Sequence, residues 1–168
     1  MIRSIQYFRI GGQEMNIEGK LKELGIELPP ASRPMANYQM TARLGSALYT
    51  SGAGYMREGK AMITGKLGDD VSMEQGYQAA RETALQLMSN LRAELGSLDK
   101  IKSFVKILGF VNSTDDFIRQ PEVINGASDV IVEVFGDKGE HARSAIGVNT
   151  LPFDIPVEIE LIVEVEEE

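Results

Sequence analysis

The sequence predicts an α+β protein in which two long helices cover one face of a single mixed sheet. Three observations support this prediction. Residues 72–95 and 121–135 carry apolar side chains at helical spacing. Residues 157–166 alternate apolar and acidic side chains, as a half-buried strand does. Residues 101–111 are apolar on both faces, so the expected order β-β-β-α-β-α-β-β leaves one sheet face to be covered by other subunits.

The first part of the chain is expected to form a short helix and then a hairpin. Residues 17–24 place apolar side chains at helical spacing and are followed by Gly25, a typical helix stop. Two strand-like runs, 38–42 and 47–51, are separated by a short turn that contains glycine, which is the pattern of a β-hairpin. Residues 60–66 are expected to add a short strand at the edge of the sheet.

The second part of the chain carries stronger local signals. Ser72, with a glutamine three residues later, has the form of a capping box and begins the first long helix, which Gly96 ends. Pro121 fits the first turn of the second long helix. Two strands follow, at residues 144–149 and 157–166.

The strand at residues 101–111 is assigned two apolar faces by simple alternation. One face is expected to carry Phe104, Leu108 and Phe110, and the other Val105, Ile107 and Val111. Because two helices cover only one of these faces, we expect a homo-oligomer whose sheets pack on each other.

The composition fits a folded protein and excludes several classes of function. The chain has 168 residues, of which 43% are hydrophobic and 25% charged, as is ordinary for a globular protein. Its formal net charge of −8 repels phosphate backbones, so we expect no nucleic-acid partner. Cysteine is absent, which excludes a disulfide framework and a thiolate nucleophile and suits the reducing cytoplasm.

The remaining composition limits cofactors, membranes and domains. The single histidine, His141, excludes mechanisms that need two imidazoles and is expected at the surface or at a rim. The acidic residues lack metal-ligand spacing, so we expect no metal and no cofactor. No apolar run approaches the roughly 20 residues of a transmembrane helix, so we expect no membrane partner. Residues 1–14 are expected to be a flexible N-terminal tail, and residues 15–168 a single domain.

Arg143 is the last basic residue of the chain and stands just ahead of a strand-like segment, which is followed by a turn with proline and then by the alternating acidic strand. A guanidinium presents a planar fork that matches a carboxylate and keeps its charge at physiological pH. Glu158, on the polar face of the last strand, could position or deprotonate a water molecule. Two interpretations stay open: a small-anion site, or a structural salt bridge at an interface between Arg143 and a glutamate of that strand.

Three further positions are candidates for ligand contact. Ser51-Gly52-Ala53-Gly54 places two glycines at a strand end, where backbone N–H groups could approach a ligand, and a tight turn is the alternative. Tyr38 could cover an apolar pocket or lie in the core or an interface. Asn125-Gly126-Ala127-Ser128 lies in the first turns of the second helix, where glycine is a poor helix former; close backbone approach or an irregular helix start would explain it.

Three motifs of the C-terminal part stand at a characteristic spacing: Ala142-Arg143-Ser144, Leu151-Pro152 and Val157-Glu158-Ile159-Glu160. With Tyr38 upstream of Thr50-Ser51-Gly52, they resemble the Rid family of reactive intermediate imine deaminases, also called the YjgF or endoribonuclease L-PSP family. The resemblance implies a chorismate-mutase-like fold and a homotrimer whose sheets form a central barrel, with sites in the clefts between subunits. It also implies hydrolysis of enamine or imine intermediates, such as 2-aminoacrylate or 2-iminopropionate, to a 2-keto acid and ammonia without a cofactor.

The resemblance also implies a role for each matching residue. Arg143 would clamp the substrate carboxylate and Glu158 would activate the attacking water, while Tyr38 would line the pocket, Ser51 and Gly52 would form its floor, and Asn125 would correspond to the asparagine of the family.

The chain departs from the family pattern in three places, which assigns it to a divergent subgroup. Ala145 stands where many members have cysteine, the segment before Asn125 is longer than usual, and the N-terminus is extended. The alternative function is a non-catalytic, regulatory trimer that binds a small carboxylate at Arg143. The endoribonuclease activity in the family's name is disfavoured by the net charge of −8 and by the lack of a stripe of basic and aromatic residues.

Overall fold

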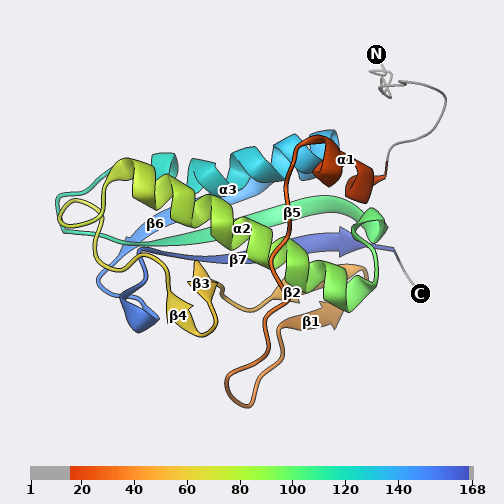
Figure 1. The fold of residues 1–168 in the computed structure, drawn as a ribbon, viewed down its shortest axis with the longest axis horizontal. Helices are drawn as coiled ribbons and strands as arrows, with labels where there is room; N and C mark the ends of the chain where they lie inside the picture. Colours follow the sequence, from red (N-terminus) through yellow and green to blue (C-terminus); the bar gives the residue numbers. More distant parts are fainter. Residues whose placement is uncertain (1–15, 167–168) are drawn as a thin grey trace.

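The computed structural model describes residues 16–166 (Figure 1). The predicted flexible tail lies outside the described residues. The helices are α1 (Ile17–Glu23), α2 (Met73–Leu95) and α3 (Gln120–Phe135). The strands are β1 (Thr41–Leu44), β2 (Ala47–Thr50), β3 (Met56–Arg57), β4 (Lys60–Ala61), β5 (Ile101–Asn112), β6 (Ala142–Val148) and β7 (Val157–Val165).

Five of these strands form one mixed sheet in the order β1-β2-β7-β5-β6. Within it, β5 is antiparallel to β7 and parallel to β6, and the other neighbours are antiparallel. The edges of the sheet are therefore β1 and β6. The two long helices, α2 and α3, pack against each other on one face of this sheet (Figure 1). This arrangement confirms the predicted α+β fold.

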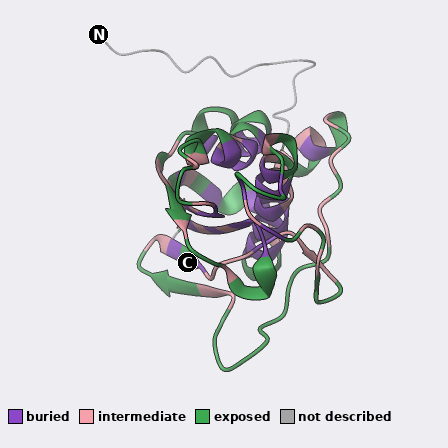
Figure 2. Cartoon of the chain, turned by 90° about the vertical axis from the view of Figure 1, so that its left-hand side faces the viewer, coloured by how far each residue is buried: buried purple, intermediate pink, exposed green. Residues whose placement is uncertain are grey.

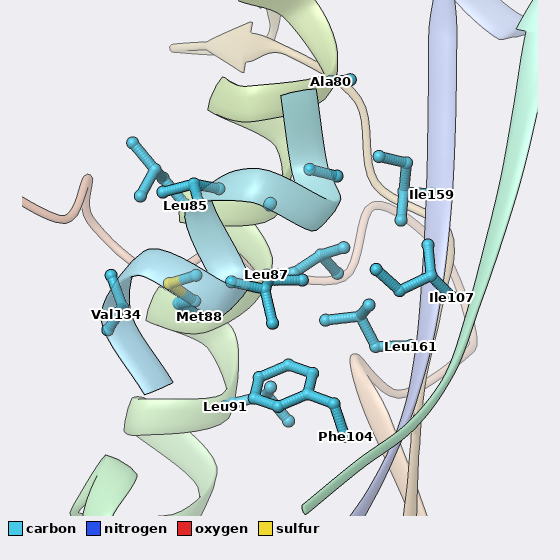
Figure 3. Close-up of a cluster of buried hydrophobic side chains, with 14 of the residues drawn as sticks. Ala80, Leu85, Leu87, Met88, Leu91, Phe104, Ile107, Val134, Ile159 and Leu161 are labelled. Atoms are coloured by element: carbon cyan, nitrogen blue, oxygen red, sulfur yellow. The ribbon is translucent and has the colours of Figure 1, made fainter. Parts of the chain in front are cut away.

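The core lies between the two long helices and the sheet, where the buried residues gather (Figure 2). Leu87 and Leu91 of α2 face Ile107 of β5 and Leu161 of β7 across this layer (Figure 3). Strand β7 alternates between buried and half-buried residues along its whole length, as predicted. Five of its apolar residues therefore enter the core, and its three glutamates point to the opposite face together with Ile162.

Local signals set the ends of α2 as predicted. The Ser72 hydroxyl accepts a hydrogen bond from the Gln75 N–H at 3.2 Å, and the Gln75 side chain accepts one from the Ser72 N–H at 2.9 Å. This is the expected capping box. Gly96 ends the helix with a φ of 77°, a left-handed conformation that favours glycine.

The predicted faces of β5 are wrong near its beginning. The pairing with β7 slips between Phe104 and Lys106, so Val105 is an extra residue that forms a β-bulge. Phe104 therefore faces the helices and is 2% exposed, whereas Val105 is 46% exposed. The ring of Phe104 packs edge-on against Phe135 of α3, with ring centroids 4.8 Å apart. Simple alternation fails here because a bulge reverses the faces of the residues beyond it.

Two other strand predictions need correction. The strand expected at residues 38–42 begins only at Thr41, so Tyr38 lies in the preceding loop. Residues 60–66 form no edge strand of the main sheet, because β4 turns back on β3 as a separate two-stranded sheet. The turn between them has positive φ angles at Glu58 and Gly59, as in the tight hairpin turn that two-residue loops favour.

The sheet face opposite the helices combines apolar and acidic side chains. No helix of the described residues lies over it (Figure 1). It carries Tyr49, Leu108, Phe110 and Ile162 together with Glu158, Glu160 and Glu164. Tyr49 is 40% exposed, so the described chain leaves this face only partly covered.

Within residues 16–166, no helix is both long and apolar enough to cross a membrane. The same residues contain no group of three histidine, aspartate or glutamate side chains that could hold a metal ion.

Candidate functional site

Arg143 lies on the helix side of the edge strand β6. Its register partner in β5 is Ile107, which faces the helix layer and is fully buried. From this position the half-buried guanidinium reaches the first turns of α3. Its Nη1 donates to Asn125 Oδ1 at 2.8 Å and to Ser128 Oγ at 3.0 Å. The structure therefore brings together two of the predicted site residues, Arg143 and Asn125.

The Arg143 guanidinium is bound only by neutral acceptors. Among the described residues no carboxylate forms an ion pair with it, and its Nε and Nη2 atoms have no hydrogen-bond partner. Within one chain, the salt bridge to the acidic strand is therefore not formed. Glu164 of that strand is instead bound by Lys102 and Ser103, each at 3.2 Å.

The unused edge of the guanidinium suits a carboxylate. An arginine can bind a carboxylate through two parallel N–H···O bonds. With Nη1 held by α3, the Nε and Nη2 atoms of Arg143 form the edge that remains for such a pair.

Glu158 lies on the opposite face of the sheet, near the start of β7. Its register partner in β5 is Phe110, and no described side chain donates to its carboxylate. Half-burial and the neighbouring Glu160 carboxylate both raise the pKa of Glu158 above its ordinary value. A glutamate with a raised pKa holds a proton more readily than an ordinary one, which suits it to take up and return a proton during a reaction.

Gly52 lies against the Glu158 side chain. Tyr49 pairs with Ile162 of β7, and Ala53 pairs with Ile159. Between these two pairs, three residues (50–52) face only two residues of β7 (160–161), so the chain forms a bulge there. This bulge brings Gly52 so close to Glu158 that an added Cβ would overlap the carboxylate, with the Glu158 Cδ only 2.9 Å away. Any larger residue at this position would have to displace the Glu158 carboxylate, which explains one glycine of the predicted motif.

Ser51 connects this region to the loop that carries Tyr38. Its hydroxyl donates to the Gln39 carbonyl at 2.6 Å, and its N–H donates to the Met40 carbonyl at 2.9 Å. Tyr38 is 44% exposed, and its hydroxyl accepts from the Met35 N–H at 3.5 Å. Tyr38, Ser51, Gly52 and Glu158 therefore belong to one region of the chain.

The predicted residues thus form two groups that one chain does not join. We call Arg143 and Asn125 the cationic group, and Glu158, Gly52, Ser51 and Tyr38 the acidic group. Strand β5 separates β6 from β7, and the two side chains Arg143 and Glu158 point to opposite faces of the sheet. Their partners in β5, Ile107 and Phe110, are three residues apart, so Arg143 and Glu158 are separated by about 10 Å along the strands. The two strand spacings from β6 to β7 add about 10 Å across the sheet.

Sequence reasoning gave no role in the site to two residues that border the cationic group, Ser128 and His141. Ser128 follows Asn125 by three positions on α3, so both side chains lie on one face of the helix. His141 was expected at the surface or a rim; it is half-buried, and its Nε2 lies 3.0 Å from Ser128 Oγ. The helical spacing from Asn125 could have indicated Ser128, whereas the contact with His141 depends on how β6 lies beside α3.

Gly126 has a packing role next to this group. A Cβ at Gly126 would overlap the Tyr77 carbonyl oxygen of α2 and lie 3.1 Å from the backbone nitrogen of Arg81. The close approach of the α2 and α3 backbones therefore explains why a glycine, a poor helix former, stands at position 126. This contact fixes α3, and with it Asn125, against the rest of the helix layer.

Comparison with known proteins agrees with this fold and with the motifs. A family model described as "YjgF/chorismate mutase-like, putative endoribonuclease" matches residues 18–165. Protein TCP17 of Trypanosoma cruzi is 43% identical over 149 residues, which cover 88% of this chain and 93% of that protein. A 2-iminobutanoate/2-iminopropanoate deaminase of Dermatophagoides farinae is 31% identical over 143 residues, which cover 84% of this chain and 95% of that protein.

Solved structures share the whole architecture. A protein of unknown function from Agrobacterium tumefaciens is 44% identical with a TM-score of 0.83, over 89% of this chain and 92% of its own. A structure from Shewanella oneidensis, described as a "putative endoribonuclease", is 31% identical with a TM-score of 0.85, over 89% of this chain and 99% of its own. The chain therefore belongs to the YjgF/chorismate mutase-like family.

Proposed function

We propose that this protein hydrolyses reactive enamine and imine intermediates, of the 2-aminoacrylate and 2-iminopropionate type, to a 2-keto acid and ammonia. The observation that carries the proposal is the Arg143 guanidinium, which neutral acceptors hold by Nη1 while its Nε–Nη2 edge stays available for a carboxylate. The relative named as an imine deaminase, at 31% identity over most of both chains, supports the same chemistry.

The proposed reaction uses one binding residue and one proton carrier. The substrate carboxylate binds Arg143, which places the imine carbon beside Glu158. A water oxygen attacks that carbon while Glu158 takes a proton from the water and passes it to the imine nitrogen, which gives a tetrahedral amino alcohol. Glu158 then takes the hydroxyl proton and passes it to the amino nitrogen, so that the C–N bond breaks as the C=O bond forms and ammonia leaves. The raised pKa of Glu158 supports this role.

The reaction needs the cationic group and the acidic group in one place, and we propose that neighbouring subunits of a homotrimer bring them together. The cationic group lies at the β6 edge of the sheet, and the acidic group lies on the side of β7 that faces β2. A head-to-tail contact joins unlike surfaces and closes into a ring when the rotation allows it. The partly covered sheet face supports the same assembly, and we propose the cytoplasm as its compartment.

The activity is tested by ammonia release from 2-iminobutyrate that a threonine dehydratase generates in the assay. The protein is expected to accelerate this release above the rate in buffer. Binding of 2-oxobutyrate without any acceleration would instead support the non-catalytic carboxylate-binding trimer. RNA cleavage is not part of the proposal, because the net charge of −8 disfavours a polyanionic substrate.

The shared site is tested by mixing two inactive variants, Arg143→Ala and Glu158→Gln. If each site takes Arg143 from one subunit and Glu158 from its neighbour, randomly mixed trimers regain intact sites. Roughly a quarter of the sites then contain both native residues, so roughly a quarter of the activity returns. Light scattering of each variant and of the mixture checks that all are trimers. A mixture of trimers that stays inactive would place the two residues in separate sites or in one chain.

A further inference from the structure

A chain of hydrogen bonds leads from Arg143 to the backbone before β6. Arg143 Nη1 donates to Ser128 Oγ at 3.0 Å, and Ser128 Oγ lies 3.0 Å from His141 Nε2. At the far side of the ring, His141 Nδ1 lies 2.6 Å from the Gly139 carbonyl oxygen. We call Ser128, His141 and the Gly139 carbonyl the relay.

The chemistry of these groups gives the direction of every bond when the His141 ring is neutral. A carbonyl oxygen only accepts, so Nδ1 of His141 carries the hydrogen and donates to Gly139. In the neutral ring Nε2 is then an acceptor, and the Ser128 hydroxyl donates its only hydrogen to it. The lone pairs of Ser128 Oγ are thereby left to accept from Arg143.

The relay holds Arg143 without neutralising it. Asn125 Oδ1 and Ser128 Oγ together occupy Nη1, so the guanidinium cannot swing about a single bond. Neither acceptor carries a charge. A carboxylate in the place of Ser128 would hold the arginine more strongly, but it would compete with the substrate carboxylate for the same cation. Arginine otherwise has large rotamer freedom that ligand binding must remove.

We propose that Ser128 and His141 are positioning residues that keep the Nε–Nη2 edge of Arg143 turned toward the substrate carboxylate. This inference rests on the proposed function of Arg143. It goes beyond that function because it assigns carboxylate affinity to two side chains that do not touch the substrate. The serine orients the arginine, and the histidine orients the serine.

Two pairs of variants test the relay with matched chemistry. Ser128→Ala removes the hydroxyl, whereas Ser128→Thr keeps it. His141→Asn keeps an amide donor within reach of Gly139 but does not reach Ser128, whereas His141→Gln reaches Ser128. Tyr77→Phe is the control, because it removes another hydroxyl bound to α3, through Asp129 Oδ2 at 2.8 Å, outside the relay.

The first readout is the dissociation constant of 2-oxobutyrate, measured by calorimetry on the assembled protein. Ser128→Ala and His141→Asn are each expected to weaken binding about fivefold, the effect of one ordinary hydrogen bond, because the bond is lost from the support of Arg143 and not from the ligand itself. Ser128→Thr, His141→Gln and Tyr77→Phe are expected to bind within about twofold of the native protein. Because the two residues act in series, the double variant is expected to be no weaker than either single variant.

The second readout does not need a ligand. In protein with ¹⁵N-labelled arginine, the Arg143 side-chain signals are identified by their loss in Arg143→Lys. Slow rotation of the guanidinium is expected in the native protein and in Ser128→Thr, and fast rotation in Ser128→Ala. Equal rotation in all three would overturn the relay even if no keto acid binds. Failure of native protein to bind any keto acid, with rotation changed as expected, would overturn the proposed function alone.

A purely structural role gives a different result. In that case the melting temperature falls, Ser128→Thr and His141→Gln bind as weakly as the truncated variants, and the inference is wrong.

Discussion

Replacing Arg143 by alanine is expected to remove carboxylate binding and leave the fold in place. The side chain contributes a charge and a free Nε–Nη2 edge to the proposed site, but only two hydrogen bonds to neutral acceptors of α3. Its role in binding is therefore larger than its role in stability. This difference is what the experiment measures.

The size of both effects follows from these contacts. Truncating one member of a buried, hydrogen-bonded charge pair costs about 2–5 kcal/mol, and the half-buried guanidinium of Arg143 places it in the lower part of this range. A loss of about 3 kcal/mol corresponds to about a 100-fold fall in kcat/KM. Arg143→Lys keeps the charge but not the fork, so a fall of roughly tenfold is expected. The two lost bonds lower the melting temperature by roughly 3–6 °C.

The assay is ammonia release from dehydratase-generated 2-iminobutyrate, corrected for the rate in buffer. Arg81→Ala is the matched control, because Arg81 is also half-buried and bound to α3, through Glu133 at 3.2 Å. It is expected to keep native kcat/KM. If Arg143→Ala retains the native kcat/KM while melting as expected, the guanidinium does not bind the substrate carboxylate and the reasoning fails.

Three further changes test other parts of the structure. Gly52→Ala is expected to displace the Glu158 carboxylate, and kcat should fall at least about tenfold because the proton carrier is misplaced. The flexible Glu158 side chain can move away from the added methyl group, so the melting temperature, measured by circular dichroism, should stay near the native value. Glu160→Gln removes the like charge that raises the pKa of Glu158, so the acidic limb of the pH–rate profile moves to lower pH; Glu164→Gln, which loses only contacts to Lys102 and Ser103, should not move it. Gly126→Ala forces α3 away from the Tyr77 carbonyl and should lower the melting temperature by roughly 5 °C or more, whereas Val132→Ala, at an exposed position of α3, should change it by less than about 2 °C.

The elements that the sequence predicted well are those whose signals are local. The Ser72 capping box, the Gly96 stop and the alternation of β7 each involve neighbouring residues only. The bulge in β5 is different, because it depends on the register that β5 adopts against β7. Nothing within residues 101–111 marks Val105 as the extra residue, so the faces of that strand could not be read from the sequence alone.

The candidate site was predictable in its members but not in its layout. Alternation in β7 already turned Glu158 away from the core. Strand β6 offered no such guide, because it is an edge strand with few buried residues, and only its parallel pairing with β5 turns Arg143 toward α3. That Arg143 and Glu158 lie on opposite faces of the sheet therefore follows only from how β6, β5 and β7 pair with one another.

The two separated charges differ from the ion pairs that other residues of the described chain form. Lys102 pairs with Glu164 and Arg81 pairs with Glu133, each at 3.2 Å. Among the described residues, Arg143 has no such partner, and Glu158 has a raised pKa because burial and a second carboxylate disfavour its charge. Burial beside a second carboxylate disfavours the charge of Glu158 in the folded chain, and Arg143 gains no ion pair there, so an ion pair within the described chain explains neither position. A cleft that joins the β6 edge of one subunit to the Gly52 region of the next would give each charge a partner: the carboxylate of the substrate for Arg143, and the attacking water for Glu158.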